Sequence, residues 1–243
     1  MMPRSALHSF TEERQGALYT GGMRVLILGA TGMIGQGVLR ECLADPAVTS
    51  VLVAGRTSLG QTHPKLTELI KSDLSSWVDV EAQLTGIDAC FYCLGISSSG
   101  MSEADYTRVT YDYALALATS LHRASTSATF CFISGASTDA TEKGSVMWAR
   151  VKGRAENALS RIGFRQLFHF RPAYIQPMDG IVSKTASYRA MYAVMSPLYP
   201  LLKRVAPKLV TSTRQIGRAM LNVTRRGFPK QVLESADINV AAQ

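Results

Sequence analysis

The chain has 243 residues, of which 47% are hydrophobic and 18% are charged. This composition excludes an intrinsically disordered protein, and the length suits one large domain or two small ones. The best candidate for a membrane span, residues 190–202, contains Pro197 and Pro200 and falls short of the roughly 20 residues that cross a bilayer. We therefore expect a protein without a transmembrane segment.

Residues 1–22 are polar and show no periodic apolar pattern. They lack the apolar core of a secretory signal, and their two glutamates offset the charge that an amphipathic targeting segment would need. We predict a dispensable, disordered extension over residues 1–22, followed by a single domain over residues 23–243. The expected location is the cytoplasm.

Cys90 and Cys93 have the spacing of a redox or zinc motif. They lie in an apolar segment that is typical of a buried strand, where an offset of three residues sends two side chains to opposite faces. We predict that all four cysteines are buried thiols in a reducing compartment. The four histidines are scattered, so we expect no metal site.

From residue 23 to about residue 171, apolar runs typical of strands alternate with segments of helical period. The predicted strands are 24–28, 50–54, 65–71, 89–93, 129–134 and 166–171. The predicted helices between them are 34–44, 78–84, 104–123 and 146–162. This alternation indicates an α/β protein whose parallel sheet is covered on both faces and binds ligands at the carboxyl ends of its strands.

Charge is spread unevenly along the chain. Residues 1–150 carry a net charge of −3, residues 151–230 carry +13, and residues 231–243 carry −2. A basic segment favours an anionic ligand, an acidic partner, or a membrane or nucleic-acid surface. We do not expect nucleic acid, because the basic residues occur singly or in pairs and no known binding module is recognisable. A small, anionic molecule is the expected partner, and peripheral membrane contact stays open.

Three glycines directly follow the first predicted strand and precede the first predicted helix. They permit a tight turn, a close approach of the backbone to a diphosphate, and close packing of helix on strand. Amides at the helix N-terminus then face the anion. This context predicts a dinucleotide site. Its predicted residues are Gly29, Thr31, Gly32, Met33, Ile34 and Gly35.

The second predicted strand ends at Arg56, 21 residues beyond Gly35. A site selective for NAD usually has an acidic residue here, which binds the ribose 2′-hydroxyl. Arginine instead pairs with a 2′-phosphate and stacks on adenine. We predict that NADP(H) is preferred. The alternative is a solvated surface arginine, which would leave NAD(H) as the cofactor.

The stretch VLILGATGMIGQGVL, the strand end AGRTS and the later pattern resemble an atypical short-chain dehydrogenase/reductase. The branch is the NAD(P)H-binding, epimerase-like group that includes the Tat-interacting oxidoreductase family. The resemblance implies a Rossmann-type doubly wound parallel sheet with a small C-terminal helical lobe on the substrate side, at about residues 177–230. It also implies cofactor contacts after the third, fourth and sixth strands. These are Asp73 and Leu74 at adenine, Cys93, Leu94 and Gly95 beside the nicotinamide ribose, and Pro172, Tyr174 and Ile175 near the nicotinamide.

The same resemblance implies a Tyr-x-x-x-Lys pair on the helix after the fifth strand, in which the lysine binds the nicotinamide ribose of the cofactor and lowers the pKa of the tyrosine. Lys152 stands at the lysine position, but Trp148 replaces the tyrosine. Indole does not titrate in the working range, so Trp148 cannot be the general acid. Ser134 is the predicted assisting serine, with Ser137 as the alternative. Tyr174, Tyr188 and Tyr192 are the candidates that could take the place of the missing tyrosine in the folded protein.

In the C-terminal third, residues 187–203 are rich in methionine and tyrosine, which at helical spacing favours core packing over a ligand site. A helix over 212–224 and a short strand over 232–234 are predicted. Lys203, Arg204 and Lys208 form the densest basic cluster.

Three functional hypotheses follow. The first is an NADP(H)-dependent oxidoreductase acting on a small carbonyl or a quinone-type substrate, since direct hydride transfer to a quinone tolerates tryptophan. The second is a cofactor-binding sensor or assembly protein without turnover. The third is a peripheral membrane protein that uses its basic lobe.

Overall fold

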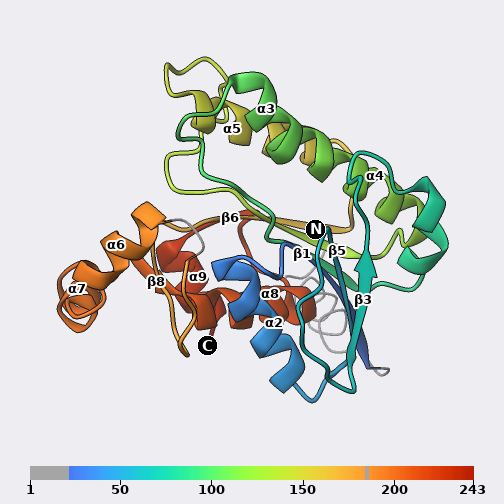
Figure 1. Cartoon of the computed structure of the whole chain (residues 1–243), viewed down its shortest axis with the longest axis horizontal. Coiled ribbons are helices and arrows are strands. Elements are labelled where there is room, and N and C mark those ends of the chain that lie inside the picture. The colour runs from blue at the N-terminus through green and yellow to red at the C-terminus, as the bar shows by residue number, and fades with distance from the viewer. Residues whose placement is uncertain (1–21, 184–185) are drawn as a thin grey trace, which may run out of the picture.

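The computed structural model describes residues 22–183 and 186–243, so the prediction for residues 1–22 lies almost entirely outside the described residues. In this part of the chain, seven parallel strands form one sheet in the order β3-β2-β1-β4-β5-β6-β9 (Figure 1). The strands are β1 (Met23–Leu28), β2 (Val48–Gly55), β3 (Leu66–Ile70), β4 (Ala89–Tyr92), β5 (Thr129–Ile133), β6 (Gln166–Arg171) and β9 (Val232–Glu234). The order reverses between β1 and β4, which confirms the predicted doubly wound sheet.

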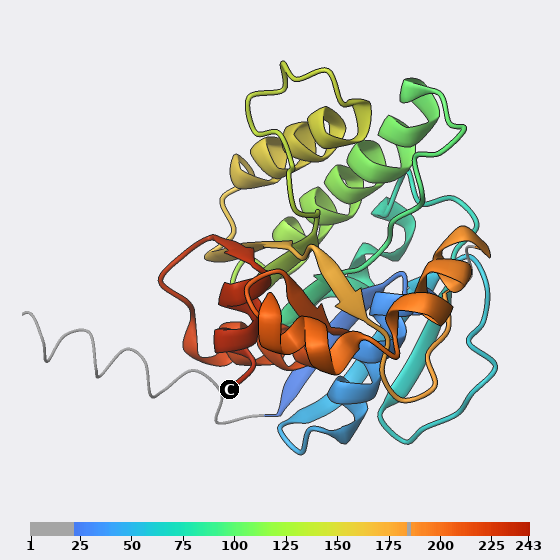
Figure 2. The ribbon, with the colours of Figure 1, turned by 90° about the vertical axis from the view of Figure 1, so that its left-hand side faces the viewer.

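Helices cover both faces of this sheet (Figures 1 and 2). One layer contains α2 (Met33–Ala44), α8 (Thr213–Arg226) and α9 (Ser235–Ala241). The other contains α3 (Glu103–Thr107), the π-helix η2 (Arg108–Asp112), α4 (Tyr113–Ala124) and α5 (Met147–Ser160). The segment predicted as one helix over 104–123 therefore includes a π-helical stretch, and the segment predicted over 78–84 is the 3₁₀ helix η1 (Val78–Leu84).

Alternate residues of β1 enter two separate cores, as the period of a strand requires. Val25 and Ile27 pack in the core under α2 and α8, while Leu26 and Leu28 pack in the core under α4 and α5. Both cores are built from apolar side chains that contact a helix layer. The sheet is thereby held rigidly between two layers, and its strand ends are fixed in space.

The two cysteines of the Cys-x-x-Cys stretch lie in different cores. Cys90 packs under α4 and α5, whereas Cys93 packs under α2 and α8 together with Cys131. All four cysteines are buried and free, and burial raises the pKa of the Cys90 and Cys93 thiols. The prediction of opposite faces is confirmed. In the described ranges, no group of three histidine, cysteine or acidic residues is placed to hold a metal ion.

The C-terminal third is divided between the sheet and a lobe. The lobe holds α6 (Ala186–Met195) and α7 (Tyr199–Val205), beside a second parallel pair formed by β7 (Tyr174–Gln176) and β8 (Val210–Ser212). The predicted lobe over about 177–230 is thus larger than the observed one, because α8 packs against α2 as part of the main layer. Nowhere in residues 22–183 and 186–243 is a helix long and apolar enough to cross a membrane.

Candidate functional site

The three glycines of the loop after β1 each have a distinct structural role. Gly29 has a φ of +85°, and a Cβ on it would lie 2.6 Å from the amide nitrogen of Leu94. A Cβ on Gly35 would lie 2.1 Å from the carbonyl oxygen of Gly29, so only glycine lets α2 begin so close to β1. A Cβ on Gly32 would meet a single neighbour, the Gly29 carbonyl oxygen at 3.3 Å, which leaves the outer side of the loop open.

The N-terminus of α2 presents backbone amides toward this open side. Gly32 is its N-cap and supplies no side-chain cap, and the first helical hydrogen bond runs from the Gln36 amide to the Gly32 carbonyl at 2.9 Å. The amides of Met33, Ile34 and Gly35 precede this bond and therefore point out of the helix. The Thr31 carbonyl accepts from the Gln36 side chain at 3.2 Å, which fixes the loop. The arrangement can bind a diphosphate.

Arg56 follows the last residue of β2 and is exposed. Its neighbours Thr57 and Ser58 are exposed hydroxyl residues, and no acidic residue stands between Ala54 and Ser58. Among the described residues, no carboxylate forms an ion pair with Arg56. A guanidinium without a protein partner can pair with an added phosphate.

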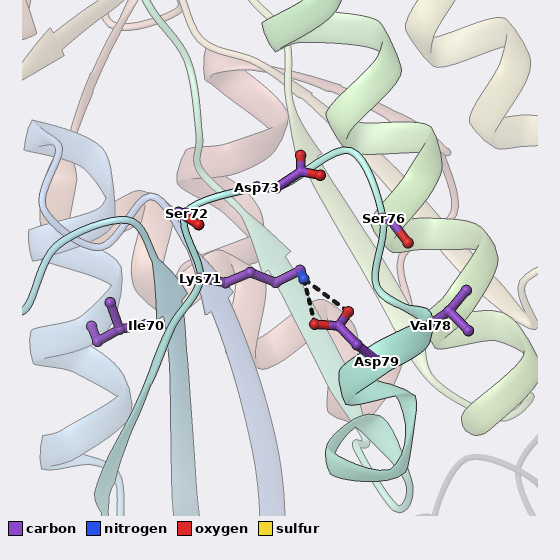
Figure 3. A pocket seen from close by; sticks show the side chains of 7 residues that line it. All are labelled: Ile70, Lys71, Ser72, Asp73, Ser76, Val78 and Asp79. Atoms are coloured by element: carbon purple, nitrogen blue, oxygen red, sulfur yellow. Dashed lines mark hydrogen bonds and ion pairs between the residues drawn. The ribbon is translucent and has the colours of Figure 1, made fainter.

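The loop after β3 carries the pair expected at adenine. Asp73 accepts hydrogen bonds from the Ser75 amide at 2.8 Å and the Ser75 hydroxyl at 2.6 Å, and these lower the pKa of its carboxyl. Leu74 is only 2% exposed and packs in the core, so its backbone alone is available to a ligand. Asp73 also lines an open pocket at the end of β3, where it points away from the Lys71–Asp79 ion pair (Figure 3).

The loop after β4 lies against the glycine turn. Cys93 is 9% exposed, its amide donates to the Leu28 carbonyl at 2.9 Å, and its side chain belongs to the core. Leu94 is partly buried and Gly95 is exposed, so the chain leaves the core at this point. The structure therefore brings Leu94 and Gly95 beside the predicted diphosphate site.

Trp148 and Lys152 lie one turn apart on α5, above the end of β5. A Cβ on Gly135 would lie 3.9 Å from both the Lys152 Nζ and the Trp148 Cζ3, so the two side chains converge on one place. Lys152 donates from Nζ to the Ser134 carbonyl oxygen. Burial lowers the pKa of Lys152 to about 8, and Glu156 partly opposes this shift. The ammonium is therefore held at the carboxyl edge of the sheet.

Ser134 contributes its carbonyl to this site rather than its hydroxyl. The side chain is 3% exposed, and its hydroxyl donates to the Phe170 carbonyl at 3.2 Å. Ser137, the alternative, is exposed in the following loop and has a φ of +66°. The Ser134 hydroxyl is thus hydrogen-bonded to β6, and Ser137 is exposed to solvent.

Arg171, at the end of β6, turns into the protein. It forms an ion pair with Glu156, which is 3% exposed, and its Nε donates to Glu156 Oε1 at 3.0 Å. Glu156 was not among the predicted site residues, although it follows Lys152 by one helical turn and this spacing could have indicated it. Pro172 is buried, and its carbonyl accepts a hydrogen bond of 3.0 Å from the Ala136 amide in the loop after β5.

Tyr174 begins β7 and contacts the lobe. Its hydroxyl donates to Gln176 Oε1 at 2.9 Å, and its ring lies 5.9 Å from the ring of Tyr192. Burial raises the pKa of Tyr174, which makes it a weaker acid than an exposed tyrosine. Ile175 packs against the core under α2 and α8. The side chain of Tyr188 lies outside what the structure describes.

The chain is similar in sequence to one known family and to several curated proteins. The sequence model of the NAD dependent epimerase/dehydratase family matches residues 25–145. A relative from Emericella nidulans, protein fmp52, is 30% identical over 158 residues, which cover 62% of this chain and 66% of the relative. Protein HTATIP2 of Rattus norvegicus is 28% identical over 153 residues, which cover 62% of each chain. The match spans slightly less than two thirds of these relatives.

The names of the fungal relatives correct one prediction. The fmp52 proteins of Emericella nidulans, Aspergillus terreus and Chaetomium globosum are named as mitochondrial. The expected cytoplasmic location is therefore wrong. The cytoplasmic prediction was inferred from composition and from the absence of a secretory signal pattern. Neither feature identifies the compartment, because targeting depends on specific signals that cellular receptors recognise.

Solved structures share the fold at low identity. The reductase domain of PhqB from Penicillium fellutanum has a TM-score of 0.64 and 14% identity, covering 95% of this chain and 71% of that chain. WbmH of Bordetella bronchiseptica, solved in complex with NAD⁺, has a TM-score of 0.61 and 15% identity, covering 87% of this chain and 74% of that chain. These likenesses support the Rossmann-type fold.

Proposed function

We propose that this chain belongs to the NAD-dependent epimerase/dehydratase family, whose sequence model matches residues 25–145, and that it is an NADP(H)-dependent oxidoreductase that reduces a small quinone-type substrate. The observation that carries the proposal is the joint placement of the open glycine loop, Arg56 and Lys152 at the carboxyl edge of one parallel sheet. This edge is where doubly wound sheets bind their ligands.

The residues present fit a nicotinamide dinucleotide. The amides of Met33, Ile34 and Gly35 would bind the diphosphate, and the missing Cβ at Gly32 leaves room for it. Arg56 would pair with a 2′-phosphate, for which the β2 end offers no competing carboxylate. Asp73 and the Leu74 backbone would contact adenine, while Lys152 would hold the nicotinamide ribose.

The nature of the substrate follows from the missing tyrosine. When bound, the nicotinamide supplies or accepts a hydride. A simple carbonyl that gains a hydride becomes an alkoxide and needs a proton donor beside it. Trp148 cannot give up a proton, and the Tyr174 hydroxyl is engaged with Gln176. A quinone that gains a hydride becomes a delocalised phenolate, which water can protonate, so this class suits the site.

The cofactor preference is tested by exchanging Arg56 for aspartate. We expect Arg56→Asp to weaken NADPH binding by about 10- to 100-fold, because a charge-assisted bond to phosphate is lost. NADH binding should change little, since aspartate can accept from the 2′-hydroxyl. Titration of cofactor fluorescence measures both dissociation constants.

The matched control is Arg161→Asp, the same charge change at an exposed residue beyond α5. It should leave both cofactors unaffected. Equal weakening of NADPH and NADH by Arg56→Asp would remove Arg56 from the site. Failure of the wild type to bind either cofactor would overturn the proposed function itself.

A further inference from the structure

The lobe formed by α6 and α7 exposes apolar side chains to a degree that the rest of the described chain does not. Of the twelve exposed large hydrophobic residues in the described ranges, six fall within residues 191–209. They are Met191, Val194, Leu198, Leu201, Val205 and Leu209. Helix α7 has no buried residue at all, although four of its seven residues are apolar or aromatic in the run YPLLKRV. A concentration of exposed apolar side chains of this kind marks an interaction surface.

Three of these apolar residues share one face of α7. Leu198, Leu201 and Val205 are three and four residues apart, the spacing that places side chains on one face of a helix. Their exposed fractions are 46%, 58% and 74%. In Figure 1, α6 and α7 project at the left-hand end of the molecule, outside both layers that cover the sheet, and Figure 2 shows this end facing the viewer. The face is therefore accessible to a large, flat partner.

The charge around this face has a single sign. Residues 180–233 contain ten lysines and arginines and no aspartate or glutamate. Lys203 and Arg204 lie in α7 itself and Lys208 follows it; all three are exposed, and no carboxylate among the described residues pairs with them. Two copies of this lobe placed face to face would repel each other. An anionic surface would attract it, and long basic side chains can reach anionic headgroups while apolar neighbours enter the acyl boundary.

We propose that the α6–α7 lobe docks this protein on the surface of a bilayer that contains anionic phospholipid. Leu198, Leu201 and Val205 enter the boundary between headgroups and acyl chains, and Lys203, Arg204 and Lys208 bind the headgroup phosphates. The lobe touches the proposed cofactor site through the Tyr174–Tyr192 ring contact. Docking thus brings the site close to the membrane, but the binding does not depend on cofactor or turnover.

The test is flotation of the full chain with vesicles of phosphatidylcholine, with or without about 30% phosphatidylglycerol. We expect the protein to bind the anionic vesicles about a hundredfold more tightly than the vesicles of phosphatidylcholine alone. Addition of about 0.5 M NaCl should strongly weaken the binding to the anionic vesicles. The charge variant Lys203→Glu/Arg204→Glu/Lys208→Glu should abolish binding. The apolar variant Leu201→Ser/Val205→Ser should weaken it by about tenfold.

Matched controls use exposed residues elsewhere. Lys143→Glu/Arg161→Glu/Arg165→Glu makes the same charge change, and Val78→Ser/Val240→Ser removes two exposed valines. Both should bind vesicles nearly as the wild type does. Thermal stabilisation by NADPH, measured on every variant, reports the fold and the cofactor site separately from docking.

Equal binding to neutral and anionic vesicles would overturn the proposal. So would lobe variants that bind as tightly as the wild type. Self-association that the lobe variants abolish, without vesicle binding by the wild type, would identify a second copy as the occupant. A protein that docks but binds no cofactor would leave this inference standing and remove the proposed function.

Discussion

At the scale of single residues, Trp148 decides which chemistry the site can perform. It lies one turn before Lys152 and converges with it on Gly135. We expect Trp148→Tyr to create an NADPH-dependent reduction of a simple aldehyde such as 4-nitrobenzaldehyde, at least about tenfold above the wild-type rate. The reason is that a phenol beside an ammonium can supply a proton, whereas indole cannot. Loss of NADPH absorbance measures the rate.

Two controls separate this gain from indirect effects. Trp148→Phe removes the indole without adding an acid and should not reduce the aldehyde. Trp148→Tyr/Lys152→Met should lose the gained activity, because the lysine no longer lowers the pKa of the phenol. If the wild type already reduces the aldehyde and Lys152→Met does not slow it, the assigned site is wrong. Binding of NADPH without reduction of any quinone would favour the sensor hypothesis.

The residue scale is also where the sequence was least informative. It correctly placed Cys90 and Cys93 on opposite faces, because strand period alone decides that. The sequence could not show that the Ser134 hydroxyl donates to the β6 carbonyl of Phe170 while the Ser134 carbonyl accepts from Lys152. Nor could it show that Glu156 would bury its carboxylate against Arg171. The hydrogen-bond and ion-pair partners of these side chains depend on residues that are distant in sequence.

At the scale of elements, the contact of α2 with α8 depends on two glycines. A Cβ on Gly37 would lie 2.6 Å from the Thr213 Cβ and 2.9 Å from the Thr213 carbonyl, whereas one on Gly217 would first meet the Glu41 side chain at 2.9 Å. We expect Gly37→Ala to lower the free energy of unfolding by about 1–3 kcal/mol, because the backbone of α8 cannot yield easily. Urea unfolding measures the change.

Gly217→Ala is the matched comparison, since it adds the same methyl group to the partner helix. Its effect should be smaller, because the two nearest atoms belong to the Glu41 side chain, which can shift more easily than the Thr213 backbone. The gain of about 1 kcal/mol that alanine brings to a helix is common to both variants and does not affect the comparison. Equal stability of the two variants, or a larger loss of stability in Gly217→Ala, would contradict this account of the α2–α8 contact.

Elements were predictable where their pattern was long enough. The six strands predicted up to residue 171, and the short strand near 232–234, all appear within about two residues of their expected bounds. The three-residue strands β7 and β8 were missed, because so short a run shows no alternation. The helix predicted over 212–224 was found as α8, yet its packing on α2 needed the three-dimensional structure.

At the scale of the whole molecule, the sequence could predict the doubly wound sheet because alternating apolar runs leave few other topologies. It could not predict how the basic residues are arranged, since charge patterning constrains surfaces and not folds. Part of the basic excess pairs with acids around α2 and α8, such as Arg214 with Asp179 and Arg218 with Glu41. Lys203, Arg204 and Lys208 on the lobe have no carboxylate partner among the described residues, and other exposed basic residues such as Arg56 and Arg161 lie elsewhere on the molecule.

The stability of the whole molecule should fall in mild acid because of His169. This side chain of β6 is 2% exposed, shares a hydrogen bond of 3.2 Å with Ser160, and has a buried Nδ1 without a partner in the described residues. Burial lowers the pKa of His169 to about 4, although Glu156 partly opposes the shift. Between about pH 6.5 and pH 4, the unfolded chain therefore binds a proton that the folded chain does not. The contribution of neutral His169 to stability is complete above pH 6.5 and is lost as the pH falls.

We expect the wild type to lose about 2 kcal/mol of unfolding free energy through this group between pH 6.5 and pH 4.5. His169→Gln should flatten that part of the curve, because glutamine carries no proton to exchange with solvent. His63→Gln, in the loop before β3, is the control and should keep the wild-type slope. Urea unfolding at several pH values measures all three curves. If His169→Gln retains the full slope, the buried imidazole is not the acid-sensitive group, and the carboxylates of the ion pairs must carry the acid response.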